Sequence, residues 1–216
     1  MKINMWNPFK KKQNKKFLKK SLPELKDKTR ILMIDDEETS LVESLKSEGW
    51  HIKYIEDLDK YTNTDLKDAH IVCVDIKGVG KKLNIKEEGL GLVRNIKDKY
   101  PEKRIILCSS VSSHDIFDNA IDLVDKKVYK DGQTHPFDSA IEELSYKLFD
   151  WDSLIKEIYF KYKSDFGIEI TLEEFSIKMK TAIDGNEIDV EKILKITAAG
   201  MKVAGGIKTL LIHFVS

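Results

Sequence analysis

Between residues 30 and 150 the chain alternates short apolar runs with longer amphipathic stretches. This alternation is typical of a parallel β-sheet wrapped by helices, because strands covered on both faces have continuous apolar sequences. The apolar runs predict strands at residues 31–34, 50–55, 71–74, 105–108 and 127–130. The amphipathic stretches predict helices at residues 38–48, 58–67, 89–100, 115–123 and 137–149. We therefore expect an α/β fold, a doubly wound (βα)5 unit with a five-stranded parallel sheet.

After residue 150 the alternation ends and helical spacing of apolar residues takes over. Helices are expected over residues 152–166, after the capping residue Thr171, and from Asp189 onward. The pair Gly205 and Gly206 costs about 2 kcal/mol relative to alanine in a helix interior. We expect a helix break there or a very close contact with a neighbouring helix. The chain thus ends in a small all-helical C-terminal module.

The charge is balanced over the whole chain but not along it. The chain has 37 basic and 37 acidic residues, yet eight lysines and no acidic residue fall in the first 20 positions. We expect three parts: a flexible lysine-rich arm at 1–27, the α/β domain at 28–150, and the helical module at 151–216. Clustered lysines favour weak contact with an anionic membrane surface. No DNA binding is expected, since residues 151–216 contain nine lysines, ten acidic residues and no arginine.

The cellular compartment is suggested by cysteine usage and by the two ends of the chain. Cys73 and Cys108 lie inside apolar runs, which favours buried free thiols and a reducing, cytoplasmic location. The first 20 residues lack the apolar core of a secretory signal. The apolar stretch at 196–215 contains Lys202 and Lys208, which are costly in a bilayer. We therefore expect no membrane span.

Polar residues follow the predicted strands at their carboxyl ends. Asp35 and Asp36 follow the first strand, Asp75 the third and Ser109 the fourth, while Lys130 ends the fifth. Ligands of open α/β sheets bind at this edge. Three carboxylates brought together there repel one another unless a cation joins them, and oxygen ligands suit Mg²⁺. A lysine at the same edge could pair with an anion held by the metal.

With these residues in this order, the chain resembles the receiver domain of response regulators in two-component signalling systems, the CheY-like superfamily, over about residues 28–150. The resemblance implies a flavodoxin-like fold and a phosphorelay switch rather than an enzyme. It implies that a histidine kinase or phosphotransfer protein phosphorylates Asp75. It further implies that Mg²⁺ is held by Asp35, Asp36, Asp75 and the backbone carbonyl of Lys77, while Ser109 and Lys130 contact the phosphoryl group. Output would then occur through protein–protein contacts.

The chain departs from the receiver pattern at several positions. Asp131 replaces the proline that usually follows the lysine, so no cis peptide is expected there. Lys127 occupies the place of the usual aromatic switch residue, with Tyr129 nearby. The loop at residues 78–88 is about six residues longer than usual, as expected of a lid or a partner-binding loop.

Two other functions and one assembly are compatible with the sequence. A haloacid-dehalogenase-type phosphatase would use Asp35 as nucleophile, although Glu37 stands where that family has aspartate. A receiver-like scaffold would keep the pocket without being phosphorylated. The apolar segment at 210–215 is expected to pack against the other tail helices, a second subunit or a separate partner. With small residues at Gly200, Ala204 and Gly205, we expect the helical module to form a homodimer.

Overall fold

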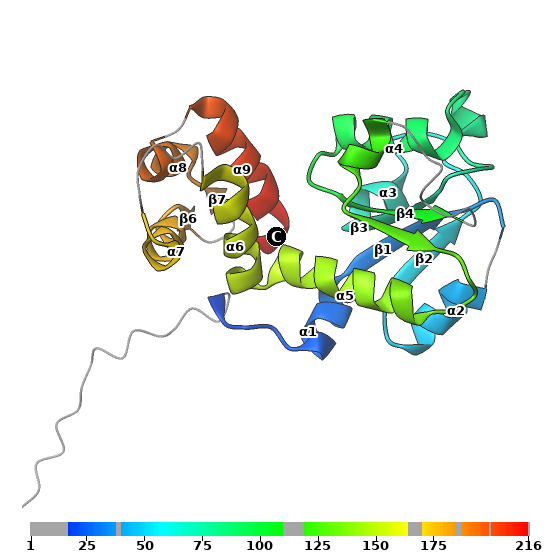
Figure 1. Ribbon diagram of the computed structural model, residues 1–216, viewed down its shortest axis with the longest axis horizontal. Helices are drawn as coiled ribbons and strands as arrows, with labels where there is room; N and C mark the ends of the chain where they lie inside the picture. Colours follow the sequence, from blue (N-terminus) through cyan, green and yellow to red (C-terminus); the bar gives the residue numbers. More distant parts are fainter. Residues whose placement is uncertain are drawn as a thin grey trace, which may run out of the picture.

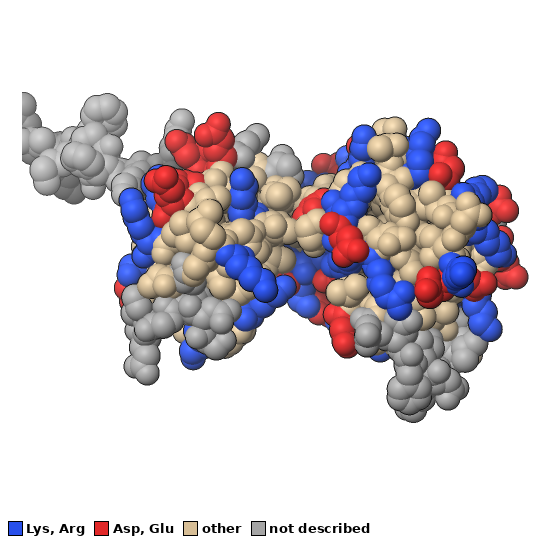
Figure 2. Space-filling view, turned by 90° about the horizontal axis from the view of Figure 1, so that it is seen from above, with Lys and Arg blue, Asp and Glu red and all other residues tan. Residues whose placement is uncertain are grey.

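The computed structural model describes residues 17–37, 40–109, 119–163, 170–184, 187–198 and 200–215. The protein has two lobes, an α/β domain and a helical module, and the long helix α5 leads from one into the other (Figure 1). On the face seen in Figure 2, lysines and acidic residues are interspersed over both lobes.

The sheet of the α/β domain confirms the predicted fold class. Its strands are β1 (Arg30–Ile34), β2 (His51–Ile55), β3 (Ile71–Asp75), β4 (Arg104–Ser109) and β5 (Lys126–Tyr129). All neighbours pair in parallel in the order β2-β1-β3-β4-β5, which is the flavodoxin-like order. Every residue of β3 and β4 is buried, because helices cover both faces. The carboxyl ends of β1, β3, β4 and β5 therefore lie next to one another.

The helices of this domain are α1 (Leu22–Lys28), α2 (Ser40–Ser47), α3 (Thr64–Asp68), α4 (Glu88–Lys99), the 3-10 helix η4 (Asn119–Leu123) and α5 (His135–Phe149). The predictions at 89–100 and 137–149 are confirmed. The prediction at 58–67 is too long, because the Asn63 side chain accepts hydrogen bonds from the amides of Asp65 and Leu66 and starts α3 there. Residues 38–39 and 115–118 of two other predicted helices lie outside the described residues.

Helix α1 is a feature that the sequence analysis assigned to the flexible arm. Ser21 caps this helix in a reciprocal arrangement with Glu24, and Pro23 lies in its first turn. Leu25 is fully buried in the core that α1 shares with α5. The expectation of flexibility was thus wrong for residues 22–27, where one buried leucine among charged residues fixes the helix. Residues 1–16 lie outside the described part of the chain.

The helical module contains the predicted helices and one short hairpin. Its elements are α6 (Trp151–Tyr162), α7 (Leu172–Lys180), β6 (Ile183–Asp184), β7 (Glu187–Ile188), α8 (Val190–Thr197) and α9 (Met201–Val215). Thr171 and Asp189 cap α7 and α8 as expected. The expectation that the module is purely helical is corrected by the β6-β7 hairpin. Strands of two residues leave no periodicity to detect.

A helix break or a close helix contact was predicted at Gly205 and Gly206, and the structure shows the close contact. The chain bends at Ala198, which has a φ of 51°, and α9 then continues through Gly205 and Gly206. A Cβ atom at Gly206 would lie 2.3 Å from the Tyr162 hydroxyl, so this glycine permits the close contact between α9 and α6.

The apolar end of the chain packs inside its own module. Leu210, Leu211, Phe214 and Val215 are buried in one cluster with Trp151. The segment therefore takes the first of its three expected places and no longer argues for a second subunit. No single helix in the described part of the chain is long and apolar enough to cross a membrane; α8 and α9 pass that test only as a pair bent by 120°.

The helical module docks at the amino end of the sheet. Arg104, at the start of β4, donates two hydrogen bonds of 2.9 Å to the carboxylate of Glu157 in α6. The same guanidinium contacts Asp125 at 2.9 Å. The rings of His70 and His213, from the start of β3 and from α9, lie 5.0 Å apart. This contact leaves the carboxyl end of the sheet at the far side of the domain.

Candidate functional site

Three aspartates meet at the carboxyl end of the sheet. Asp35 directly follows β1 and Asp75 ends β3, and the register that pairs Ile34 with Val74 sets the two side by side. Asp36 joins them, and one oxygen from each of the three carboxylates lies within 4.8 Å of the others. Asp35 and Asp75 are buried, whereas Asp36 is exposed. The cluster is therefore reached from solvent on the side of Asp36.

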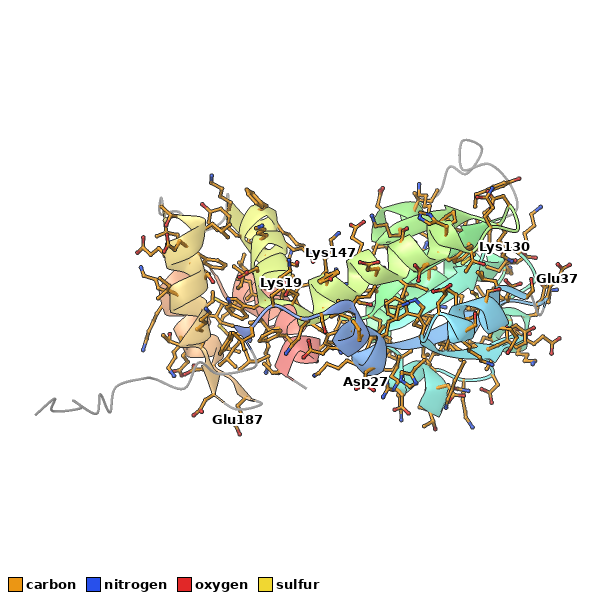
Figure 3. The ribbon with its side chains drawn as sticks, turned by 90° about the horizontal axis from the view of Figure 1, so that it is seen from below. Lys19, Asp27, Glu37, Lys130, Lys147 and Glu187 are labelled. Carbon is orange, nitrogen blue, oxygen red and sulfur yellow. The ribbon has the colours of Figure 1, made fainter. Side chains whose placement is uncertain are left out.

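Lys130 follows β5 and bridges the two buried aspartates. Its Nζ atom lies 2.5 Å from Asp35 Oδ2 and 2.9 Å from Asp75 Oδ1. Its backbone amide donates a 2.7 Å hydrogen bond to the carbonyl of Ser109, which fixes it at the end of β4. Figure 3 shows Lys130 and Glu37 toward the end of the domain that is remote from the helical module.

Burial and the neighbouring charges shift the pKa values of both Asp75 and Lys130. Burial raises the pKa of Asp75, and the opposing hydrogen bond and charge of Lys130 offset only part of that effect. For Lys130, burial lowers the pKa, but hydrogen bonds to Asp35 and Asp75 outweigh it and leave the pKa raised. The ammonium group stays charged, while ionised Asp75 is disfavoured. A further cation near Asp75 would stabilise its charged form.

The remaining predicted residues lie at the same edge. Ser109 is the last residue of β4 and is buried; its predecessor Cys108 pairs with Asp75 in the sheet register. Lys77 is exposed in the bend two positions after Asp75, so its carbonyl as a ligand stays a prediction. No cis peptide occurs in the described ranges, including Lys130–Asp131, as expected. Tyr129 is about half exposed, and Cys73 and Cys108 are buried free thiols.

The donor set fits a magnesium ion. All three side chains that meet are carboxylates, the hard oxygen ligands that Mg²⁺ prefers. Lys130 contacts the buried oxygens of Asp35 and Asp75, which leaves the exposed side with Asp36 for a cation. Mg²⁺ usually keeps several waters, and such an open side accommodates them.

Residues around Asp36 were not predicted from the sequence. Gly78 has a φ of 79°, and a Cβ atom there would lie 1.8 Å from Asp36 Oδ2. The Nζ atom of Lys81 lies 3.9 Å from the same oxygen. Both residues belong to the segment at 78–88, whose unusual length was visible in the sequence. The residues that this segment contacts could be identified only from the fold.

Comparisons with known proteins complement this geometry. No protein-family model matches the chain, and no curated protein matches it. Solved structures similar to the chain include response regulator receiver domains. Response regulator TrrA from Thermotoga maritima, in complex with Mg²⁺ and BeF, has 24% identity and a TM-score of 0.44 over 54% of this chain and 98% of its own.

Two further similar structures contain a kinase or a phosphorylated aspartate. A complex of histidine kinase ThkA with TrrA has 26% identity and a TM-score of 0.42, over 54% of this chain and 97% of the matched one. A response regulator from Burkholderia pseudomallei, with a phosphorylated aspartic acid, calcium and citrate, has 16% identity and a TM-score of 0.42. That match covers 82% of this chain and 96% of the regulator.

Proposed function

We propose that this protein is a response-regulator-like switch that accepts a phosphoryl group on Asp75 from a histidine kinase or phosphotransfer protein. The observation that carries the proposal is the position of Lys130, held between Asp35 and Asp75 with Asp36 beside them. One cation already neutralises part of the negative charge at the end of β3. The carboxylate that would react is also the one whose pKa is raised by burial.

The chemistry follows from charge. A carboxylate attacks phosphorus only when the negative charge of both partners is neutralised. An Asp75 oxygen would form the new bond to phosphorus while the bond from phosphorus to the donor imidazole breaks, and the imidazole leaves with a proton. When bound, Mg²⁺ would be held by Asp35, Asp36 and Asp75 and would supply positive charge that offsets the negative charge of the phosphoryl group. Lys130 pairs with those oxygens, and the Ser109 hydroxyl donates a hydrogen bond to them.

The output would run through α5 to the helical module. This helix runs from His135 to Phe149 and is followed directly by Asp150, whose side chain caps α6. A structural change in the residues between Lys130 and α5 would therefore be transmitted to the helical module by one continuous helix. We propose that the module presents its surface to a protein partner, since its lysines and acidic residues are balanced in number.

The test of the proposed function is the intact mass of the protein after incubation with acetyl phosphate and Mg²⁺. We expect one phosphate adduct in the wild type, labile to hydroxylamine, and none in Asp75→Asn. Asp131→Asn, at an exposed neighbouring aspartate, is the matched control and should keep the adduct. Complete absence of an adduct in the wild type would instead support the scaffold alternative.

Metal dependence provides a second test. Mg²⁺ should raise the melting temperature of the wild type by binding to the folded state only. At a concentration of 100 times the dissociation constant, the gain is about 2.7 kcal/mol. Asp36→Ala should remove this response. A wild-type melting temperature that does not change with Mg²⁺ would show that the three carboxylates form no metal site.

A further inference from the structure

The segment between β3 and α4, residues 76 to 87, lies beside Asp36 of the aspartate cluster. It contains the 3-10 helix η2 (Lys81–Leu83) and the fully buried Val79, which packs in the same core cluster as Leu58 and Leu92. At its far end, a Cβ atom at Gly89 would lie 1.8 Å from the carbonyl oxygen of Asp75, so α4 starts directly against the end of β3. We call residues 76 to 87 the β3–α4 loop.

The carboxylate of Asp57, a residue that follows strand β2, holds this loop in place through hydrogen bonds. Asp57 lies just after β2 and is buried, with 9% of its surface exposed. Its Oδ1 atom accepts hydrogen bonds from the amides of Leu58, at 2.8 Å, and Gly80, at 2.6 Å. Its Oδ2 atom accepts one from the amide of Lys82, at 2.9 Å. Both oxygens of a buried charge are thus satisfied by backbone donors, two of them in the loop.

The loop in turn confines Asp36. Lys81 lies between the two backbone positions that Asp57 holds, and Gly78 lies two residues before them. Both residues lie close to Asp36 Oδ2. Gly80 has a φ of 82°, a conformation that is favourable for glycine only. The amide of Gly78 also donates a 3.3 Å hydrogen bond to Glu88 of α4. The exposed member of the aspartate cluster therefore depends on the loop for its position.

We propose that Asp57 is a positioning residue that orients Asp36 for Mg²⁺ through the β3–α4 loop. The inference rests on the proposed function, because it assigns to Asp57 an effect on the metal site of that function. Groups that orient metal ligands from behind typically change metal affinity 10- to 100-fold when they are removed. Asp57 acts on the loop through the hydrogen bonds that its carboxylate accepts from the amides of Leu58, Gly80 and Lys82.

The two substitutions at this position have graded effects. Asp57→Ala removes all three acceptor contacts and should weaken Mg²⁺ binding at least tenfold. Asp57→Asn keeps one oxygen for Leu58 and Gly80 but turns an NH₂ group toward the amide of Lys82, so it should weaken binding less. Asn63→Ala is the matched control, because the Asn63 side chain also accepts hydrogen bonds from two backbone amides, but at the start of α3 and not in the loop. It should bind Mg²⁺ like the wild type.

The experiment combines two readouts on the full chain. Calorimetric titration with Mg²⁺ alone gives the affinity, and limited trypsin digestion followed by mass spectrometry gives the rate of cleavage after Lys81 and Lys82. We expect faster cleavage at these loop lysines in Asp57→Ala, with no such change in Asn63→Ala. If Asp57→Ala does not fold, the smaller changes expected for Asp57→Asn decide the matter.

Each outcome bears on one of the two proposals. Wild-type Mg²⁺ affinity and loop cleavage in both folded Asp57 variants would overturn the inference while leaving the proposed function intact. An equal loss of affinity in Asn63→Ala would overturn it as well, because the loss would then reflect general destabilisation. If the wild type binds no Mg²⁺, the proposed metal site fails and with it the positioning role; cleavage of the loop then shows only that Asp57 holds the loop in place.

Discussion

The two ends of the sheet each hold a basic side chain between two carboxylates, with opposite consequences. At the amino end, Arg104 lies between Asp125 and Glu157, with contacts of 2.9 Å to both. At the carboxyl end, Lys130 lies between Asp35 and Asp75. At the amino end the helical module covers the starts of β3 and β4, whereas the carboxyl end is open at Asp36.

The pKa values of Asp125, at the amino end, and Asp75, at the carboxyl end, are shifted in opposite directions. Burial would raise the pKa of Asp125, but Lys97, Arg104 and the amide of Ile105 outweigh it and the pKa is lowered. The pKa of Asp75 is raised, because one lysine does not compensate for burial and for the neighbouring Asp35. Balanced charge at the amino end stabilises the contact between the lobes. Excess negative charge at the carboxyl end is typical of a site that binds a cation.

Arg104→Ala should have the largest effect on stability. It leaves Asp125 and Glu157 without their shared cation in a buried contact, and the loss of one partner from a buried pair costs about 3 to 5 kcal/mol. The measurement is urea unfolding, with Lys46→Ala, which removes an exposed pair with Glu43, as the control. A loss below about 1 kcal/mol, as in exposed pairs, would show that this contact does not hold the lobes together.

The histidine pair at the same contact predicts a loss of stability in mild acid. Burial lowers the pKa of His70 to about 4 and that of His213 to about 3. Since the unfolded chain takes up these protons near the ordinary value of 6.5, stability is complete above that pH and falls as the pH drops toward 4. The loss at pH 4 should be roughly 2 to 3 kcal/mol per histidine. His213→Phe should reduce the pH dependence measured by urea unfolding between pH 7 and 4; an unchanged slope would contradict the prediction.

The smallest effect on stability is expected at Asp75, at the carboxyl end, where removal of the charge should stabilise the protein. Because the folded pKa of Asp75 is raised, its ionised form destabilises the protein at neutral pH, and stability is gained as pH falls toward that pKa. Without Mg²⁺, Asp75→Asn should therefore melt at a higher temperature than the wild type at pH 7. This advantage should shrink toward pH 4. A lower melting temperature for Asp75→Asn would show that Asp75 has a stabilising role like that of Asp125.

Much of this comparison could be predicted from the sequence, because strand ends and apolar runs are local features. The five strands lie within two residues of their predicted bounds, and the topology then brings Asp35, Asp75 and Lys130 together. The amino end was not predicted. Arg104, Asp125 and Glu157 are unremarkable charged residues in the sequence, and only the docking of α6 joins them.

The contacts of the β3–α4 loop and of helix α1 were also not predicted from the sequence. Asp57 follows its strand as the site aspartates follow theirs, but two of its three amide partners lie more than 20 positions away in a loop without periodicity. Leu25 and the partly buried Leu22 mark the core-facing side of α1 among charged residues. In both places the contact that decides the structure is long-range, so neither propensity nor spacing could identify it.

The most direct measurement of the central claim is the location of the phosphoryl group after reaction with acetyl phosphate and Mg²⁺. Proteolysis and tandem mass spectrometry of the borohydride-reduced adduct would distinguish the peptide containing Asp75 from that containing Asp35 and Asp36. The account predicts modification of Asp75 alone, and its persistence in Asp125→Asn at the opposite end of the sheet. Modification of Asp35 in place of Asp75 would contradict the account and favour the phosphatase alternative.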